Sequence, residues 1–386
     1  MSDSISPARR KRLLYICDWL PPDFGAVGQY GLLFAREAAR AGADVVLAGL
    51  SSRGTSETVE PAGPGSLKIV ALNAAPCRKD DLARRMAWTV KTNTRLVSSL
   101  FHEMRRADEI VFTGSPPLFL HWIAPLNLLL GKRLTYRITD FHPECLIASR
   151  GRASLLLRLL YRLTLFWRRR VDAFEALGED QRRRLQDIGI PLSRITLKRD
   201  ISPVRIDAKM EALTRPAAYN GKVLLLYSGN WGVAHDYLTF VRGYLRHHQR
   251  GSGRVVLWLN ALGSHAAAVA DQLAAFELPL IKTAPVPLDE LARLLVSPDA
   301  HLITLSDPFV GFVLPSKVYG CLESRKPILF IGSAKSDVHL LCGRTRARSY
   351  WRVDAGDALG FAETLEDLAD HVEAKEQARK FAAGVT

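Results

Sequence analysis

The chain has 386 residues, of which 48% are apolar and 24% charged, so it can bury a sizeable core and is not intrinsically disordered. This length favours two domains over one. The formal net charge is +14, and residues 1–215 carry +13 of it, whereas residues 216–386 are nearly neutral. We therefore expect the first half to face an anionic partner, and nucleic acid, a membrane surface or a phosphorylated substrate would each fit.

Cysteine spacing and the lengths of apolar runs argue against a disulfide-rich, zinc-binding, secreted or membrane-spanning protein. The five cysteines are widely spaced and form no CxxC pair, which argues against a disulfide framework or a structural zinc site. The first apolar run, residues 13–17, is too short for a signal-peptide core. The longest, residues 117–130, falls short of the roughly 20 residues that cross a bilayer. These features predict a cytoplasmic protein.

Short apolar runs alternate with amphipathic segments, which predicts an α/β fold with largely parallel sheets. In the first half we expect a helix at 28–41 and strands at 13–17, 44–48, 69–72, 109–113, 133–138 and 173–177. In the second half we expect strands at 223–228, 255–260, 301–305 and 327–331, and helices at 236–248, 288–295 and 316–323. Prolines and the lack of an apolar period place the linker at 202–222. The sequence thus predicts two Rossmann-like, doubly wound domains, 1–205 and 206–386.

A glycine-containing loop, DWLPPDFGAVGQYG, follows the first predicted strand. Gly25, Ala26 and Gly28 lie where the next helix opens, so backbone N–H groups there can approach a phosphate or a sugar. The spacing differs from GxGxxG, which disfavours a dinucleotide. We expect Gly25 and Ala26 to contact a donor substrate, and the alternative is a tight turn without a ligand.

Two loops of the second half carry a candidate anion site. The stretch SGNWGVAHDY follows a buried strand and includes Gly229 and Asn230. In LPSKVYG, Pro315 suits a first helical position, so Ser316 and Lys317 would lie in the first turn. Their hydroxyl, amides and ammonium would then point at an anion such as a diphosphate. The alternative is a capped helix with a solvated lysine.

The motifs PPDFGAVGQY, YSGNWGVAHDY, VPLDELARLL and LPSKVYGCLESRKPILFIG, in this order and spacing, resemble the retaining glycosyltransferases of family 4. The resemblance covers nearly the whole chain and is greatest to the subgroup that builds bacterial surface polysaccharides and lipid-linked sugars. It implies the GT-B fold, with both domains facing a central cleft. The first domain would bind acceptor and the second nucleotide-sugar, and the resemblance allows the last helix to pack back on the first domain. It also implies no metal and no cofactor beyond the nucleotide-sugar co-substrate.

Several positions depart from the family pattern. Phe312 and Gly320 stand where the family has two glutamates, the second of which holds the nucleotide ribose. Glu323, one turn further along the predicted helix, is a candidate replacement, and a surface charge is the alternative. Asn230 and His235 align with an expected arginine and lysine. Lys317 would then be the main cation at the diphosphate.

The TDFHPE turn, residues 139–144, resembles the family's His-Asp-x-x-Pro-Glu turn, with Thr139 in place of the histidine. Asp140 is the first candidate for a catalytic residue near the reacting hydroxyl. His142 is a second candidate, since its imidazole could reach the same site from two residues further on. Either group could accept a proton from the acceptor if it lies within hydrogen-bond reach. The alternative is an ordinary turn with a helix-capping aspartate.

Two basic segments of the first half could meet the anionic partner. Residues 150–170 hold seven arginines and no acid, interleaved with leucines and aromatics, and residues 78–106 hold eight cations against three acids. Such segments suit an anionic membrane interface. The candidate membrane or acceptor residues are Trp88, Arg158, Arg162, Trp167, Arg168 and Arg169. The alternative is that each helix packs its apolar stripe on the sheet and solvates its arginines.

Together these features predict a metal-independent hexosyltransferase of polysaccharide synthesis. It would use a nucleotide-sugar donor and a polyprenyl diphosphate-linked glycan acceptor, and would associate peripherally with the inner face of the cytoplasmic membrane. One alternative is a sugar-nucleotide epimerase of the same fold, and another is a catalytically degenerate homologue that acts as a partner subunit. A nucleic-acid-binding protein is disfavoured, because the basic stretches are leucine-rich helices of an α/β domain without a recognisable binding module.

Overall fold

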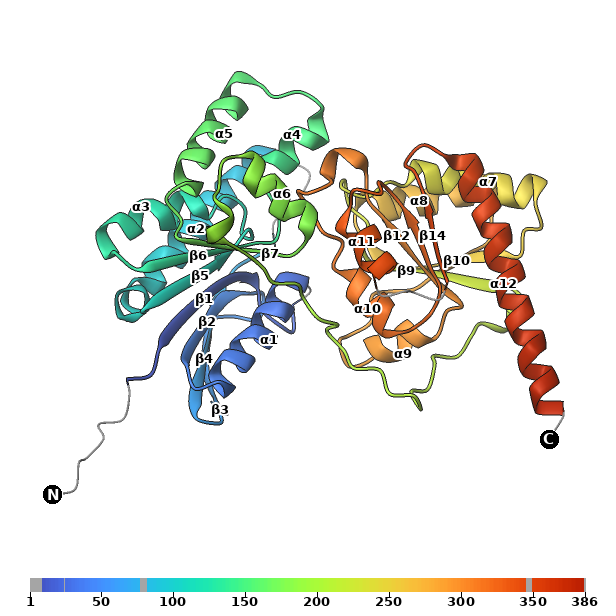
Figure 1. The fold of residues 1–386 in the computed structure, drawn as a ribbon, viewed down its shortest axis with the longest axis horizontal. Helices are drawn as coiled ribbons and strands as arrows, with labels where there is room; N and C mark the ends of the chain where they lie inside the picture. The colour runs from blue at the N-terminus through green and yellow to red at the C-terminus, as the bar shows by residue number, and fades with distance from the viewer. Residues whose placement is uncertain (1–8, 24, 77–81, 345–348, 385–386) are drawn as a thin grey trace. The chain divides into compact units, whose positions relative to one another are not determined.

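The computed structural model describes residues 9–23, 25–76, 82–344 and 349–384. It divides into two compact units, Met1–Arg199 and Asp200–Thr386, which we call unit 1 and unit 2. The division falls close to the predicted boundary at residue 205. Each unit is an α/β domain built on an open sheet (Figure 1), which confirms the predicted fold class.

Unit 1 contains an eight-stranded sheet of order β3-β4-β2-β1-β5-β6-β7-β8. All neighbouring strands are parallel except the antiparallel pair of β3 and β4. The strands are β1 Arg12–Trp19, β2 Asp44–Ser51, β3 Ser56–Ala62, β4 Gly65–Asn73, β5 Glu109–Thr113, β6 Arg133–Ile138, β7 Ala173–Ala176 and β8 Ile195–Leu197. The α-helices are α1 Ala26–Arg40, α2 Leu82–Arg106, α3 Leu120–Leu130, α4 Glu144–Arg150, α5 Leu155–Arg168 and α6 Glu179–Asp187.

Unit 2 contains a six-stranded, wholly parallel sheet of order β11-β10-β9-β12-β13-β14. Its strands are β9 Val223–Asn230, β10 Val255–Leu262, β11 Leu280–Lys282, β12 Ala300–Thr304, β13 Ile328–Ile331 and β14 Tyr350–Val353. Its α-helices are α7 Leu238–Arg250, α8 Ser264–Ala275, α9 Leu291–Val296, α10 Lys317–Glu323, α11 Asp337–Arg344 and α12 Ala358–Gly384. Residues 200–216, which overlap the predicted linker 202–222, have no regular structure, and Arg215 ties this segment to Asp299 of unit 2.

The ten predicted strands are all present, because a strand buried on both faces of a parallel sheet is a continuous apolar run. In β1, residues 13–17 are all buried. The four strands not predicted, β3, β8, β11 and β14, are mostly short and lie at sheet edges. Their sequences, such as SETVEPA and LIK, carry little apolar signal of their own.

Strand order places one crevice in each sheet. In unit 1 the chain leaves β1 toward β2 and later returns on the other side at β5, and in unit 2 it leaves β9 toward β10 and returns at β12. Successive crossover helices therefore diverge at the carboxyl ends of β1 and β9, which is where ligands bind in doubly wound sheets. Asp18 lies near the end of β1, and Gly229 lies near the end of β9.

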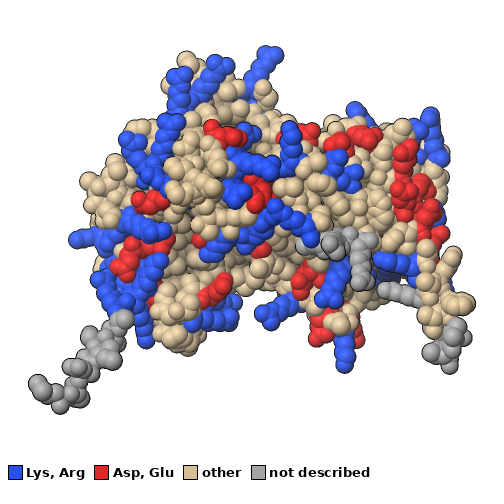
Figure 2. All heavy atoms as spheres, viewed as in Figure 1, with Lys and Arg blue, Asp and Glu red and all other residues tan. Residues whose placement is uncertain are grey.

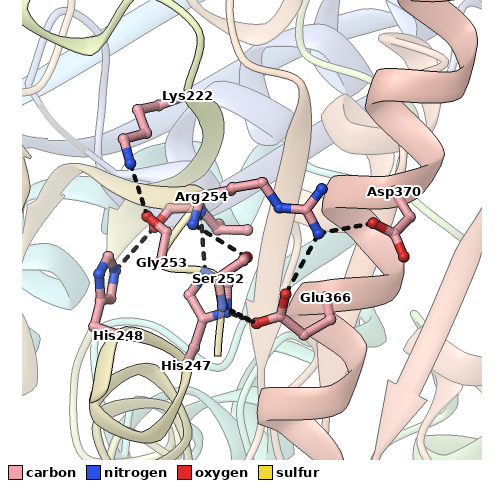
Figure 3. A network of polar contacts seen from close by, with 9 residues as sticks. Lys222, His247, His248, Ser252, Gly253, Arg254, Glu366 and Asp370 are labelled. Atoms are coloured by element: carbon pink, nitrogen blue, oxygen red, sulfur yellow. Dashed lines mark hydrogen bonds and ion pairs between the residues drawn. The ribbon is translucent and has the colours of Figure 1, made fainter. Parts of the chain in front are cut away.

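The last helix, α12, is fastened to unit 2 by a polar network at α7 (Figure 3). Nε2 of His247 accepts the backbone N–H of Val255 at 3.1 Å, so Nδ1 carries the proton and donates to Glu366 at 2.5 Å. The N–H of Ser252 and the guanidinium of Arg254 also reach Glu366, at 3.0 and 3.5 Å. Although burial opposes ionisation of Glu366, these donors lower its pKa to about 2.

Replacing Glu366 by alanine should lower the unfolding free energy of unit 2 by about 2 kcal/mol, because several donors lose their acceptor. The folded pKa lies below the unfolded value, so this stabilisation is complete above pH 4.5 and is lost as the pH falls toward 2. Urea denaturation at several pH values measures both effects. Asp367→Ala, at an exposed position of the same helix, is the matched control, and an equal loss in that variant would contradict the assignment.

Candidate functional site

The crevice of unit 1 contains two half-buried carboxylates, Asp18 at the end of β1 and Asp140 just after β6. Burial and the charge of Asp18 raise the pKa of Asp140 to about 6. Burial also raises the pKa of Asp18 to about 6, against the opposing effect of a hydrogen bond with Ser115. In the part of the chain that the structure describes, Oδ1 of Asp18 is buried without a hydrogen-bond partner. Such a pair can hold or accept a proton near neutral pH.

Asp18 was not among the predicted site residues. Its charge acts on Asp140 across the end of β5, which stops just before Gly114 and lies between β1 and β6. A Cβ at Gly114 would stand 2.6 Å from the carbonyl oxygen of Asp140, so only glycine allows the two turns to approach this closely. The available sequence signal was an acid at the end of the first buried strand, YICDW.

The TDFHPE turn is held from two sides by buried side chains. The guanidinium of Arg168, the last residue of α5, makes two hydrogen bonds to the carboxylate of Glu144, one of them 3.0 Å long, and donates to the carbonyl oxygen of His142 at 3.0 Å. Nε2 of Gln181 donates to the carbonyl oxygen of Thr139 at 3.2 Å. Arg168 has no exposed surface, so its predicted role as a membrane or acceptor contact is wrong. Its charge is compensated inside the fold by Glu144.

The two candidate catalytic residues of this turn have different electrostatic surroundings. His142 is half-buried, and burial together with the charges of Arg168 and Arg85 lowers its pKa to about 4. Its imidazole is therefore neutral near pH 7 and can accept a proton. The charge acting on Asp140 belongs to Asp18 instead. The turn thus offers two separate proton acceptors.

Gly25 and Ala26 lie at the start of α1, also at the carboxyl end of β1. Gly25 is the N-cap, and the helix has neither a side-chain cap nor an acid in its first turn. A Cβ at Gly28 would stand 1.8 Å from the carbonyl oxygen of Trp19, so close packing of the helix on the strand accounts for that glycine. Gly25 and Ala26 remain predicted donor contacts.

In unit 2 the structure brings Lys317, Gly229 and His235 together at the carboxyl end of β9. Nζ of Lys317 is buried, lies 3.1 Å from the ring centroid of Tyr227, and has no hydrogen-bond partner among the described residues. A Cβ at Gly229 would lie 4.0 Å from Cε of Lys317, so the glycine borders the lysine stem. Burial lowers the pKa of Lys317 well below 10.5. A buried amine without a polar partner at a strand end is a candidate ligand group.

His235 is buried, and its Nδ1 donates to the carbonyl oxygen of Thr304 at 2.6 Å. Burial and the charge of Lys317 lower its pKa to about 3, so the imidazole is neutral. His235 can therefore accept a hydroxyl proton in a hydrogen bond but cannot supply positive charge. Asn230, the last residue of β9, is exposed beside it in the same loop.

The block around Pro315 differs in detail from the predicted clamp. Ser316 is the N-cap of α10 without a side-chain hydrogen bond, and Lys317 is the first helical residue. Glu323 is the last residue of this helix and is exposed, at the end opposite Lys317. In a parallel α/β sheet that helix end lies toward the amino edge of the strands, away from the ligand edge. This position does not fit the predicted ribose contact of Glu323.

Gly320, where the resembling family has its ribose-binding glutamate, is buried in α10. A Cβ there would stand 3.0 Å from Cδ1 of Leu295 on α9, so a longer side chain would have to displace that leucine. The packing of α10 on α9 therefore requires a small residue at this position.

The other predicted membrane residues divide into two groups. Arg158, Arg162 and Arg169 are exposed. Trp88 is half-buried, because its ring stacks on Trp19 at 6.3 Å and its Nε1 donates to the carbonyl oxygen of Ala75 at 2.8 Å. Trp167 is half-buried beside Phe166. Within the described ranges there is no cluster of three or more His, Cys, Asp or Glu side chains able to hold a metal ion.

No model of a protein family matches this chain. A probable glycosyltransferase of Pseudomonas aeruginosa, WbjE, is 23% identical over 282 residues, which span 69% of this chain and 67% of WbjE. HepE of Anabaena, whose structure holds UDP and glucose, superimposes with a TM-score of 0.61 at 10% identity, over 97% of this chain and 100% of HepE. A UDP-forming trehalose-phosphate synthase of Burkholderia vietnamiensis gives 0.62 at 11% identity, over 92% and 91%.

These likenesses establish the fold. The chain has the GT-B fold, with two Rossmann-like domains, as the resemblance of its motifs implies. Together with the similarity to WbjE, they support a glycosyltransferase-like function. No helix within the described ranges is both long and apolar enough to cross a membrane.

Replacing Arg168 by methionine should lower the unfolding free energy of unit 1 by about 4 kcal/mol, because Glu144 would be left buried and uncompensated. The double variant Arg168→Met/Glu144→Leu should recover much of that loss, since no charge then remains buried. Chemical denaturation measures both. Arg169→Met, at the exposed neighbouring position, should change stability by less than about 0.5 kcal/mol. A small effect of Arg168→Met would show that the pair does not hold the turn.

Carboxyl carbon NMR of labelled aspartate should find Asp18 and Asp140 titrating near pH 6, as a coupled pair. Asp18→Asn should lower the midpoint of Asp140, because the neighbouring like charge is removed. Asp23→Asn, with a carboxyl of lowered pKa in the same loop, is the control and should leave that midpoint unchanged.

Stability should follow the same titration. The folded pKa of Asp140 lies above the unfolded value of 3.8, so ionisation opposes folding as the pH rises through 6. Asp140→Asn should therefore stabilise unit 1 above pH 6 by roughly 2 kcal/mol, and the gain should vanish below about pH 4. Ordinary midpoints near pH 4 for both carboxyls would contradict the pairing.

Proposed function

We propose that this protein transfers a hexose from a nucleoside-diphosphate sugar to a hydroxyl group of a lipid-linked glycan, with retention of anomeric configuration. The observation that carries the proposal is Lys317, whose buried amine has no polar partner among the described residues and which is the first residue of α10. The structures of HepE with UDP and with UDP-glucose, on the same fold, support a UDP-sugar as the donor.

In the donor half, the diphosphate would lie against Lys317, Ser316 and the amino end of α10 after Pro315. Burial disfavours the charged amine in the free protein, and the negative charge of the diphosphate would favour it. Donor binding would therefore raise the pKa of Lys317. The ammonium would then stabilise the charge that develops on the leaving nucleoside diphosphate. The proposal includes no metal ion.

The other polar groups at the end of β9 would orient the sugar and nucleotide. His235 would accept a hydrogen bond from a hydroxyl through Nε2, because its Nδ1 proton is already given to Thr304. Gly229 and Asn230 would present backbone and amide groups from the same loop.

In the acceptor half, the hydroxyl oxygen would form the new bond to the anomeric carbon as the bond to the diphosphate breaks. The hydroxyl proton would pass to the Asp18–Asp140 pair or to neutral His142, or to the leaving diphosphate on the same face. The glycan acceptor and bacterial polysaccharide synthesis rest on the motif resemblance. They are supported by the excess positive charge of the first half of the chain.

Two other functions stay open to test. An epimerase is favoured only by the fold of a putative UDP-N-acetylglucosamine 2-epimerase of Listeria monocytogenes, which superimposes with a TM-score of 0.57 at 11% identity. Conversion of the donor sugar without an acceptor would support that function over transfer. A degenerate partner subunit is suggested by Phe312 and Gly320 at the family's glutamate positions. Neither donor hydrolysis nor transfer would then be observed.

A thermal-shift screen with UDP, GDP and dTDP should find a nucleotide that stabilises the protein, and Lys317→Met should abolish that shift. Turnover in this variant should fall about 100-fold or more, because one stabilising group at the leaving oxygen is lost. The ligand-free variant should be at least as stable as the wild type, since a buried amine with a lowered pKa opposes folding below pH 10.5.

Lys335→Met, at an exposed position of the same unit, is the matched control and should keep both the shift and the turnover. Near-normal turnover in Lys317→Met would disprove the proposed role of the lysine. Stabilisation by none of the three nucleotides would argue against nucleotide-sugar transfer as a whole.

A further inference from the structure

Helix α5 has one buried face and a separate apolar face that is exposed. Leu157, Thr164 and Arg168 point into unit 1 and are at most 5% exposed. A second row, a quarter of a turn or more away, is largely open to solvent: Leu155 is 76% exposed, Leu156 77%, Leu159 53%, Leu163 45% and Phe166 44%. At about 100° per residue these five side chains fall within one arc of the helix. The helix therefore does not use this arc for packing.

The neighbouring helix α3 also exposes apolar side chains. Helix α3 packs beside α5, with Nε2 of His121 3.0 Å from Oγ1 of Thr164, and its last turn exposes Leu128 at 65% and Leu129 at 86%. Seven of the twenty large exposed hydrophobic residues in the described chain thus belong to these two helices. Concentration of this kind marks an interaction surface more often than chance exposure does.

A row of arginines lies on α5 directly beside the row of exposed apolar side chains. Arg158, Arg162 and Arg169 are exposed, lie on one face by helical spacing, and make no ion pair among the described residues. The segment 150–170 contains no acid to neutralise them. In Figure 2 the end of unit 1 that carries α4 and α5 is mostly blue and tan.

We propose that the exposed face of α5 and the end of α3 form a docking surface for an anionic lipid bilayer. We call it the leucine–arginine surface, and it consists of Leu128, Leu129, Leu155, Leu156, Leu159, Leu163, Phe166, Arg158, Arg162 and Arg169. The apolar row would enter the headgroup boundary while the arginines meet lipid phosphates. Nucleic acid would satisfy only the arginines and leave the leucines in water, and therefore suits this surface less well.

The surface is also placed to serve the reaction. The last residue of α5 is Arg168, which holds Glu144 and the carbonyl of His142 in the turn that carries Asp140. A bilayer bound to the outer face of α5 would thus lie one helix away from the proposed acceptor half. This inference rests on the proposed function only for the identity of the acceptor, because lipid binding by itself requires no turnover.

Vesicle flotation of the full-length chain tests the inference. The protein should bind vesicles of phosphatidylcholine mixed with phosphatidylglycerol, bind phosphatidylcholine alone weakly, and dissociate as salt is raised. Arg158→Gln/Arg162→Gln should weaken binding to the anionic vesicles roughly 20-fold. Arg242→Gln/Arg246→Gln makes the same charge change at exposed positions of α7, with the same spacing, and should leave binding unchanged.

The apolar row is tested separately. Leu156→Ser/Leu159→Ser should weaken vesicle binding roughly tenfold or more without lowering the melting temperature, because both side chains are exposed. Leu262→Ser/Leu359→Ser, at exposed positions of unit 2, is the control pair.

Several results would overturn the inference. They are equal binding to neutral and anionic vesicles, wild-type binding by either α5 variant, dimerisation through Leu156 and Leu159 without vesicle binding, or tighter binding to nucleic acid than to vesicles.

The vesicle assay contains no nucleotide. Vesicle binding without any stabilisation by UDP, GDP or dTDP would therefore count against the proposed transfer alone, and stabilisation without vesicle binding would count against the docking surface alone.

Discussion

The buried guanidinium of Arg168 is the interaction on which the proposed acceptor half depends. It has no exposed surface, it is neutralised by Glu144, and it also donates to the carbonyl oxygen of His142. An arginine in this position helps to fix the path of the turn, together with the hydrogen bond from Gln181 to the carbonyl oxygen of Thr139. The same residue ends α5, so one buried ion pair connects that helix to the TDFHPE turn.

Several ionisable groups are buried without enough hydrogen bonds or opposite charge to stabilise their ionised form. Asp18, Asp140 and Lys317 all lie at the carboxyl ends of strands, and burial moves the pKa of each toward its neutral form. Such groups cost stability in the free protein, and they are retained where a ligand or a reaction can use them. In each unit, ionisable groups whose charged form is disfavoured by burial thus lie at the crevice that the strand order creates.

The structure shows which of the basic residues are paired inside the fold and which are exposed. Of the arginines in the segment 150–170, Arg168 is internal and balanced, whereas Arg158 and Arg162 are exposed and unpaired in the described chain. The net charge alone does not separate these cases. Only the exposed arginines can attract an anionic partner, and they lie beside leucines that packing does not use.

The sequence by itself determined the fold class, ten of the strands and the candidate loops, because parallel strands are continuous apolar runs and ligand loops follow their carboxyl ends. It also singled out Asp140 in a turn after a strand and Lys317 in the first turn of a helix after Pro315. It could not reveal that the charge of Asp18 acts on Asp140, since that depends on the order of β1, β5 and β6 in the sheet. Nor could it separate Arg168 from Arg169, or show that Glu323 lies at the wrong end of α10. Tertiary structure decided these points. The order of strands in the sheet, and the face of a helix that packs against it, determine which side chains are buried and which lie at the site.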